Sequence, residues 1–344
     1  MQSIATEEFK KVLAEKREIV WNEIQKFLPN KEPHEHYKIV REYPERKGKY
    51  LRPSLVLLAC EAFGGDPAKA VRTAAAMQTS EDWILIHDDW MDGSDLRREK
   101  PCLHRMYGDY QAINAGDALH MIMWKILLDN HEVLGHEKSM EVANEFYNIL
   151  LTTAEGQWLE GTWMQDSRLD LSDEEWFKVA DTKAGYYTIT GPMRLGAIVA
   201  GKSKETLDKL FEFGIPFGRA FQLQDDILNV AGDEKKYGKE IGGDILEGKR
   251  TLILGYLMRT CSPQEKKKVE EIFAKPRPQK TEEERNYVLD LMRKHGSIDY
   301  ARAVAKKLAS QAKEIFEKNF HHLPDTEAKK NLKLAVDFVV NRDV

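Results

Sequence analysis

Residues 83–92 read Trp-Ile-Leu-Ile-His-Asp-Asp-Trp-Met-Asp, an apolar run that ends in three carboxylates. The run contains neither Gly nor Pro and continues a block of alanines, which begins behind Asp66 and the proline that follows it. An N-cap aspartate followed by proline indicates that one long helix begins there. On that helix Asp88 and Asp92 lie one turn apart on the same face, with Asp89 beside them. Stacked carboxylates on an apolar helix repel each other, and hard cations relieve that repulsion.

A second acidic cluster ends another apolar helix. Residues 221–229 read Phe-Gln-Leu-Gln-Asp-Asp-Ile-Leu-Asn, so Asp225 and Asp226 are adjacent and Asn229 follows one turn after Asp225. Two facing helices with such clusters would frame a slot of oxygen ligands, which suits Mg²⁺ rather than Zn²⁺. Taken alone, each cluster is equally well explained by a helix cap or a solvated acidic face.

Basic residues stand near both clusters. Arg97 and Arg98 follow the first cluster, Lys239 and Lys249 follow the second, and Lys49 and Arg52 open another apolar segment. Protein-bound Mg²⁺ usually shares the phosphate oxygens of a substrate, and Arg and Lys bind the remaining oxygens through charge-assisted hydrogen bonds. The combination therefore predicts a site for a diphosphate.

The composition favours helices throughout. Of 344 residues, 42% are hydrophobic and 32% charged, with 22 Gly and 12 Pro, which is typical of long helices with solvated faces. A net charge of −5 argues against a nucleic-acid partner. No apolar run reaches the roughly 18 residues of a membrane span. Cys60, Cys102 and Cys261 lack metal-ligand spacing and are too few for a disulfide framework, so we expect a cytoplasmic protein.

We expect an all-α protein with one domain over residues 1–344. Its core would lie at about 45–260, and a loop at 275–280 would precede polar helices within 281–341. Helical periodicity predicts helices at 7–27, 52–63, 66–92, 110–134, 139–167, 172–202, 204–231, 250–260, 281–295, 298–319 and 325–341.

Together these motifs resemble those of the all-trans isoprenyl diphosphate synthases, the family of farnesyl and geranylgeranyl diphosphate synthases. The matching segments, in chain order, are Gly48-Lys49-x-x-Arg52-Pro53, Asp88-Asp89-x-x-Asp92 with Arg97-Arg98, Pro101 and His104, then Gly116-Asp117, Gly156-Gln157, Lys183, Phe221-Gln222-x-x-Asp225-Asp226, Gly238-Lys239, Gly242, Asp244 and Gly248-Lys249. The resemblance implies the isoprenoid synthase type I fold, a large helical bundle around a central cavity, and a homodimer.

The resemblance also implies a reaction: head-to-tail condensation of isopentenyl diphosphate with dimethylallyl, geranyl or farnesyl diphosphate. It implies about three Mg²⁺ ions per site, with Mn²⁺ as an alternative. The implied metal ligands are Asp88, Asp89, Asp92, Asp225, Asp226 and Asn229, and the implied catalytic residues are Asp88, Asp89, Lys183 and Asp225. The implied substrate-binding residues are Lys49, Arg52, Glu81, Arg97, Arg98, Lys183, Gln222, Lys239 and Lys249.

Some positions depart from the family pattern. Asn229 replaces the last aspartate of the second cluster, Glu99 replaces a glycine and Ala184 a threonine. Glu81 stands where the family has a Gln or His that touches isopentenyl diphosphate, so this carboxylate would need a cationic partner such as Lys49 or Arg98.

The length of the product depends on the helix before Asp88. Trp83 lies about 7.5 Å from Asp88 along the helix axis, and with Ile84 and Ser80 it would limit the pocket for the growing chain. An aromatic residue here resembles the short-chain members, so we expect geranylgeranyl diphosphate as the main product. The alternatives are a farnesyl or longer-chain synthase, a class I terpene cyclase, and a non-catalytic subunit on the same fold.

Overall fold

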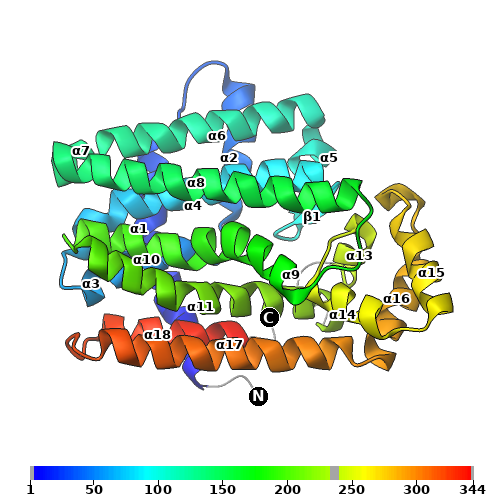
Figure 1. Ribbon diagram of the computed structural model, residues 1–344. Coiled ribbons are helices and arrows are strands. Elements are labelled where there is room, and N and C mark those ends of the chain that lie inside the picture. The colour runs from blue at the N-terminus through cyan, green and yellow to red at the C-terminus, as the bar shows by residue number, and fades with distance from the viewer. Residues whose placement is uncertain (1–3, 233–239, 342–344) are drawn as a thin grey trace.

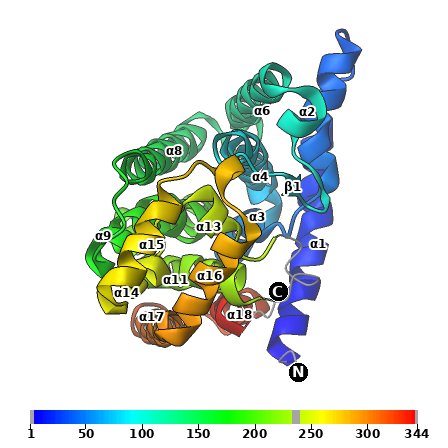
Figure 2. The same cartoon turned by 90° about the vertical axis from the view of Figure 1, so that its right-hand side faces the viewer.

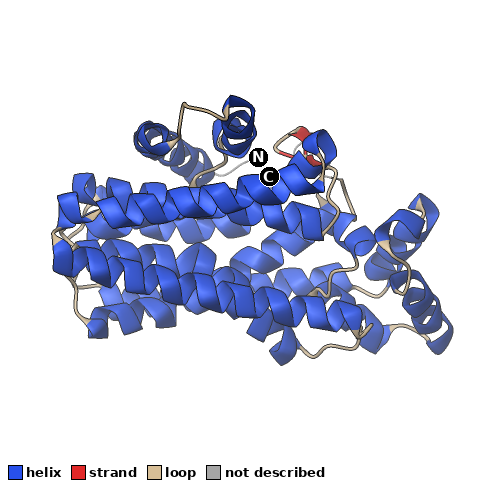
Figure 3. Ribbon diagram, turned by 90° about the horizontal axis from the view of Figure 1, so that it is seen from above, coloured by secondary structure: helices blue, strands red, loops and turns tan. Residues whose placement is uncertain are grey.

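Helices make up most of the chain in the computed structural model, which describes residues 4–232 and 240–341 (Figure 3). The elements up to residue 134 are α1 (Ile4–Phe27), α2 (His34–Arg46), α3 (Leu51–Ala62), α4 (Pro67–Met91), β1 (Leu96–Arg97), β2 (Lys100–Pro101), α5 (Leu103–Tyr107), α6 (Asp109–Asp129) and α7 (His131–Leu134). The later elements are α8 (His136–Gln165), α9 (Asp173–Val179), the π-helix η1 (Ala180–Thr190), α10 (Gly191–Val199), α11 (Lys204–Ala231), α13 (Gly243–Glu247), α14 (Leu252–Thr260), α15 (Pro263–Phe273), the 3₁₀ turn η2 (Arg277–Gln279), α16 (Glu282–Lys294), α17 (Ser297–Phe320) and α18 (Glu327–Asn341).

The long helices run lengthwise beside one another and form a bundle. Figure 1 shows α6, α8, α4, α11 and α17 in this direction, with the short helices α13 to α16 gathered at one end. In the view along the bundle, α3 and α4 lie inside the other helices (Figure 2). The all-α fold expected from the sequence is therefore confirmed.

The position of α4 follows from its sequence. The Asp66 side chain accepts a hydrogen bond from the Ala68 amide at 3.0 Å, and Pro67 occupies the first turn, so the helix begins where the capping signal predicted. Residues 73–80 are all buried. The small alanines in this stretch allow α6 and α3 to pack closely on α4. This packing fixes the acidic end of α4 relative to the rest of the bundle.

The C-terminal helices contribute to the bundle core. Phe316 and Phe320 of α17 and Val336 of α18 share one buried cluster with Leu55 of α3 and Phe213 of α11. The polar appearance of this region in the sequence reflects its solvated face, because each helix also presents an apolar stripe to the bundle.

Among the differences from the sequence prediction, three have a physical explanation. The segment 34–46 forms α2, although Pro44 lies inside it and obscures the helical pattern. The segment 96–101 forms an antiparallel strand pair, with Leu96 opposite Pro101, and two-residue strands are too short for an alternating pattern. The predicted helix 172–202 is divided by the π-helix η1, whose wider turns leave no signal in the hydrophobic periodicity.

Two further findings concern membrane spans and cysteines. Within residues 4–232 and 240–341, no helix has both the length and the apolar character that a membrane crossing requires. Cys60, Cys102 and Cys261 are all free thiols.

Candidate active site

The two acidic clusters meet at the same end of the bundle. Asp92 directly follows α4, Asp225 and Asp226 lie in α11, and Asp244 lies in α13. The Lys249 ammonium joins these elements, because its Nζ lies 2.9 Å from Asp92 Oδ2 and 3.9 Å from Asp244 Oδ1. Asp244 is also close enough to Asp226 for its charge to raise the pKa of that carboxyl. The clusters therefore belong to one site.

A second lysine, Lys183 of η1, reaches the same site. Its Nζ lies 2.6 Å from Glu160 Oε2 on α8 and 3.8 Å from Asp88 Oδ1 on α4. Gln157, one turn before Glu160, approaches the same Asp88 oxygen with its Nε2 at 3.5 Å. Of the three predicted metal-binding carboxylates in the first cluster, Asp88 and Asp92 thus each lie beside a lysine.

Close helix crossings place Lys183. A side chain at Gly218 of α11 would collide with the backbone of Gly185 in η1, and one at Gly156 of α8 would collide with the Thr182 side chain. Without these glycines the helices could not approach so closely. The contacts hold η1 against both α11 and α8, and Lys183 lies between the two contact points in the sequence.

Burial and crowding of charge change the ionisation of the site. Burial raises the pKa of Asp92, the Lys249 charge lowers it, and the Asp88 charge raises it, with a net pKa of about 7. Burial lowers the pKa of Lys183, but the charges of Glu160 and Asp88 outweigh it, so the pKa lies above the ordinary lysine value. The site therefore combines ammonium groups that stay charged with carboxylates whose charges oppose one another.

Asp89, the middle residue of the first cluster, points away from the other two. Its side chain is fully buried, and its oxygens accept hydrogen bonds from Arg97 Nε at 2.9 and 3.1 Å, from Arg97 Nη2, and from the Tyr43 hydroxyl at 2.6 Å. The structure thus does not bring Asp89 together with Asp88 and Asp92, nor does it leave Arg97 facing them. Adjacent residues on a helix differ in direction by about 100°, and Arg97 and Tyr43 draw Asp89 inward.

Three of the predicted substrate-binding residues, Arg52, Glu81 and Arg98, form a second charged group. Arg52 Nη1 lies 3.2 Å from Glu81 Oε2, and Arg98 Nη2 lies 3.9 Å from Glu81 Oε1. Arg98 Nη2 also donates to Asp82 Oδ1 at 3.0 Å. Lys49 lies at the surface just before α3. The expectation that Glu81 needs a cationic partner agrees with these contacts, with Arg52 as its nearer partner.

The remaining predicted residues of the second cluster have local partners. Gln222 Nε2 donates to Asp226 Oδ1 at 2.8 Å. Asn229 is buried, and its Oδ1 accepts a hydrogen bond from the Asp244 amide at 3.1 Å, so it holds the start of α13. Lys239 lies outside the described residues.

The predicted chain-length residues face different neighbours. The Trp83 ring packs against His120 of α6, with ring centroids 4.7 Å apart. Ser80 is fully buried, and its hydroxyl lies 3.1 Å from the Tyr187 hydroxyl of η1. Ile84 is partly buried against the same core cluster as Trp83. Trp83 and Ser80 are one turn apart on α4, but Trp83 contacts α6 and Ser80 contacts η1.

The sequence prediction missed several residues of this site. Tyr43, Asp82 and Glu160 bind predicted residues as described above, and Glu247 accepts from Lys249 at 2.9 Å and from Arg277 at 3.3 Å. Glu160 lies one turn after the Gly156-Gln157 motif, so helix spacing could have identified it. Tyr43 lies 46 residues from its partner Asp89, and Arg277 lies beyond the last motif, so local spacing gave no signal for either.

The described part of the chain contains no cluster of three or more His, Cys, Asp or Glu side chains that could hold a metal ion by itself.

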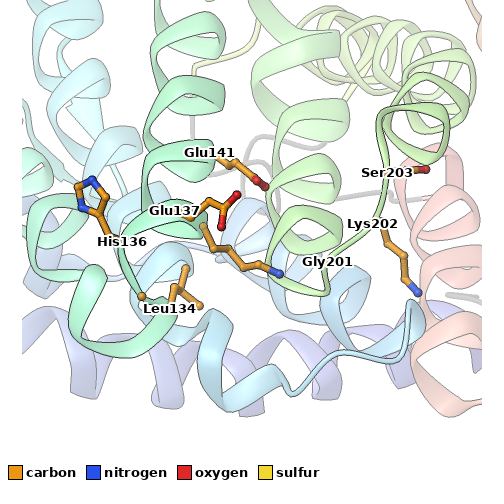
Figure 4. A pocket seen from close by; sticks show the side chains of 9 residues that line it. Leu134, His136, Glu137, Glu141, Gly201, Lys202 and Ser203 are labelled. Atoms are coloured by element: carbon orange, nitrogen blue, oxygen red, sulfur yellow. The ribbon is translucent and has the colours of Figure 1, made fainter.

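A surface hollow of about 620 Å³ lies at the end of the bundle opposite the acidic clusters, between the α7–α8 and α10–α11 junctions (Figure 4). Its lining includes Glu137, Glu141, Lys138 and Lys202, so charges of both signs line it. Its position separates it from the acidic clusters.

Known proteins resemble this chain over most of its length. The polyprenyl synthetase family matches residues 33–292. The short chain isoprenyl diphosphate synthase of Methanothermobacter thermautotrophicus is 33% identical over 296 residues, which are 86% of this chain and 87% of that protein. Geranylgeranyl pyrophosphate synthetase from Pyrococcus horikoshii superposes with a TM-score of 0.85 at 31% identity, covering 97% of this chain and 99% of that one. A polyprenyl synthase from Caulobacter crescentus, complexed with calcium and isoprenyl diphosphate, gives a TM-score of 0.86 at 25% identity over 100% and 99% of the two chains. The chain belongs to the polyprenyl synthetase family.

Proposed function

We propose that the protein is a short-chain trans-prenyltransferase, which joins isopentenyl diphosphate head-to-tail to an allylic diphosphate and makes mainly geranylgeranyl diphosphate. The observation that carries this proposal is the pairing of Asp88 and Asp92 with Lys183 and Lys249. Asp226 of the second cluster lies close to Asp244 and Glu160, which contact the same two lysines. The family membership and the names of the similar proteins support the same activity.

Magnesium fits the donor set of this site. The oxygens are carboxylates, which are hard ligands, and burial with mutual repulsion raises the pKa of Asp92 and Asp226. A divalent cation would relieve that repulsion. Because Mg²⁺ usually takes a few carboxylates and completes its shell with substrate phosphates, a site that lacks a preformed three-residue cluster is suitable. Calcium in the similar Caulobacter protein supports a divalent ion here as well.

We revise the ligand set accordingly. Asp88, Asp92, Asp225 and Asp226 would hold the ions, and Asp244 joins them because it acts on Asp226 and Lys249. Asp89 would instead fix the position of Arg97, from which it accepts hydrogen bonds. Asn229 would fix the start of α13 through its hydrogen bond from the Asp244 amide.

The protein's own residues would bind, orient and shield the reactants. When bound, Mg²⁺ supplies Lewis-acid stabilisation of the charge that develops on the departing diphosphate. Lys183 and Lys249 hold other diphosphate oxygens and stay protonated, since their pKa values are raised. Apolar residues such as Trp83 and Ile84 keep water from the allylic cation. The double bond of isopentenyl diphosphate forms the new carbon–carbon bond, and the released diphosphate accepts the proton that is lost.

Lys49, Arg52 and Arg98 would bind isopentenyl diphosphate. Arg52 and Arg98 face the side of α4 that carries Glu81, about two turns before Asp88. This separation leaves room for two diphosphates on one helix, which a condensation of two substrates requires. A terpene cyclase takes one isoprenoid substrate and would not need the second basic group.

The direct test is incubation of the protein with Mg²⁺, isopentenyl diphosphate and each allylic diphosphate in turn, followed by chromatography of the dephosphorylated products. We expect twenty-carbon geranylgeraniol as the main product. Farnesol or longer alcohols would correct the chain length alone. Turnover of an allylic diphosphate without isopentenyl diphosphate would support a terpene cyclase, and absence of any Mg²⁺-dependent turnover would support a non-catalytic subunit.

We propose that the protein is a homodimer that pairs through α6 and α8. These neighbouring helices expose apolar side chains to solvent: Tyr110, Met121, Leu128, Met140, Tyr147, Leu151 and Trp158. Both helices lie at the outer surface of the bundle (Figure 1). An exposed apolar face of this kind usually marks an interface. The resemblance to known synthases implies that the partner is a second copy of this chain.

The three free cysteines support the cytoplasm, a reducing compartment, as the location of the protein.

A further inference from the structure

Two adjacent carboxylates of α4, Glu81 and Asp82, face the two arginines of the isopentenyl side. Glu81 is partly accessible, whereas Asp82 lies beneath it and is fully buried. Asp82 Oδ1 accepts hydrogen bonds from Arg98 Nη2 at 3.0 Å and from Gln78 Nε2 at 3.3 Å.

The contacts of Asp82 do not compensate fully for its burial. In the part of the chain that the structure describes, Asp82 Oδ2, Gln78 Oε1 and the Tyr50 hydroxyl are buried without a hydrogen-bond partner. A buried carboxylate that is not fully satisfied disfavours folding. Its one close cationic partner in the described chain is Arg98, so the role of Asp82 must be sought in that arginine.

Arg98 is held from three directions. Besides Asp82, it donates from Nη1 to the Tyr43 carbonyl at 2.8 Å. Its guanidinium also packs against Gly48, where an added Cβ would lie 2.8 Å from Nη2. Its backbone has a φ of +52°, which side chains rarely adopt. The Arg98 guanidinium therefore lies against Gly48, the residue just before Lys49 in the basic motif.

We propose that Asp82 is a positioning residue for isopentenyl diphosphate. It holds the Arg98 guanidinium from below, so that the free N–H groups of Arg98 face the diphosphate beside Lys49 and Arg52. Asp82 does not touch the substrate and acts through Arg98. This inference rests on the assignment of Arg98 to isopentenyl diphosphate under Proposed function.

The surroundings of Asp82 also predict a dependence on pH. The charged and titratable groups that face it are Glu81 on the same helix, Arg98 on the β1–β2 turn, Tyr50 before α3, and Tyr187 of η1 with its neighbour Arg52. Burial raises the pKa of Asp82 to about 6, although Arg98 lowers it. The pKa values of both tyrosines are raised, so they stay neutral. Below pH about 6 Asp82 is protonated, so Arg98 loses the nearer of its two counter-charges, and Glu81 remains at 3.9 Å.

The test is the isosteric variant Asp82→Asn, measured by steady-state kinetics in the full-length protein. Loss of one charged hydrogen-bond partner of Arg98 should raise the KM for isopentenyl diphosphate about tenfold. The KM for the allylic diphosphate and kcat should change less than about twofold. The lost interaction binds isopentenyl diphosphate equally in the ground state and in the transition state, so it affects only the KM for that substrate. The rise in wild-type KM for isopentenyl diphosphate as pH falls through about 6 should be weaker in the variant.

Glu145→Gln is the matched control. Glu145 of α8 is also a buried carboxylate that binds an arginine, Arg194 of α10. It accepts hydrogen bonds from Arg194 Nε at 2.5 Å and from Arg194 Nη2 at 3.0 Å. Its loss should lower the melting temperature without changing either KM. If Asp82→Asn does not fold, Gln78→Leu removes the other donor to Asp82 and should raise the same KM by a few fold.

The outcomes separate this inference from the proposed function. Wild-type protein that incorporates no isopentenyl diphosphate contradicts the function itself. Active wild type with an unchanged KM in the folded Asp82→Asn variant overturns the positioning role. An equal rise of both KM values, or a similar rise in Glu145→Gln, also overturns it, because either would show a general structural effect.

Discussion

Glu81 and Asp82 illustrate at the scale of single residues how burial separates the tasks of neighbours. Asp82 is enclosed and stabilises the position of Arg98. Glu81 stands at the rim of the same basic group, where its charge neutralises Arg52 before the substrate arrives. The two carboxylates should therefore have opposite effects on the binding of isopentenyl diphosphate.

Glu81→Gln should lower the KM for isopentenyl diphosphate. Removal of the negative charge leaves Arg52 and Arg98 free for the diphosphate, and an effect of about 1 kcal/mol corresponds to roughly fivefold. The KM for the allylic substrate, measured in the same assay, serves as the control and should stay constant. A higher KM for isopentenyl diphosphate would show instead that Glu81 is needed to orient Arg52.

Trp83→Ala should lengthen the product beyond twenty carbons, because the ring that packs on His120 would no longer fill the space beside α4. Chromatography of the dephosphorylated products measures the effect. Trp176→Ala is the matched control, since Trp176 is a buried tryptophan in a separate cluster. Trp176→Ala should lose about 3–5 kcal/mol of stability, as a buried Trp does, and Trp83→Ala should lose less because Trp83 is only partly buried. Only Trp83→Ala should change chain length. An unchanged product in Trp83→Ala would mean that the ring serves helix packing alone.

At this scale the sequence predicts residues whose role follows from spacing and misses those defined by distant contacts. Asp88 and Asp92 share a helix face because they are four residues apart, and each lies beside a lysine in the structure. The direction of Asp89 depends on Tyr43, which lies 46 residues earlier in the chain. No local pattern reports such a contact.

At the scale of elements, the site is positioned by backbone approach between helices. Gly218 of α11 and Gly185 of η1 lie against each other, and this contact sets the distance between Lys183 and the Asp225–Asp226 pair. The bounds of α4 were predictable because its cap and apolar pattern are local. The π-helix was not, since it arises from the packing of η1 on α11 and α8.

Gly218→Ala should impair both folding and catalysis. The added methyl group would collide with the Gly185 backbone and separate η1 from α11, at a cost of about 1–3 kcal/mol. The melting temperature and kcat should both decrease. The control Gly161→Ala lies in helix α8 with open space around its Cβ, and there alanine should be neutral or slightly stabilising. Full activity in Gly218→Ala would show that the crossing does not control the position of Lys183.

For the whole molecule, we infer one domain, because α17 and α18 share a core cluster with α1, α3 and α11. The sequence indicated this only in part, since the solvated faces of the C-terminal helices dominate their composition. The proposed pairing of two copies leaves a weak trace in the sequence too. The apolar residues of α6 and α8 repeat at helical spacing just as core residues do, and only the structure distinguishes those that face solvent.

Tyr147→Glu should convert the proposed dimer to a monomer, because a charge in the middle of an apolar interface is costly to bury. Sedimentation velocity measures the change. Ile19→Glu is the control, since Ile19 is 48% exposed on α1 against 56% for Tyr147 on α8, and it should leave the dimer intact. A wild-type monomer, or a Tyr147→Glu variant that stays dimeric, would contradict pairing through this face.

The two lysines beside Asp88 and Asp92 have a consequence for the order in which ligands bind. Under the proposed ligand set, each ammonium is an internal counter-ion that would have to turn from its carboxylate before a metal could bind that oxygen. An incoming diphosphate offers the ammonium groups a new anion and thereby vacates the carboxylates. Metal and diphosphate should therefore be heterotropic effectors of each other, and by reciprocity each raises the affinity of the other by the same factor.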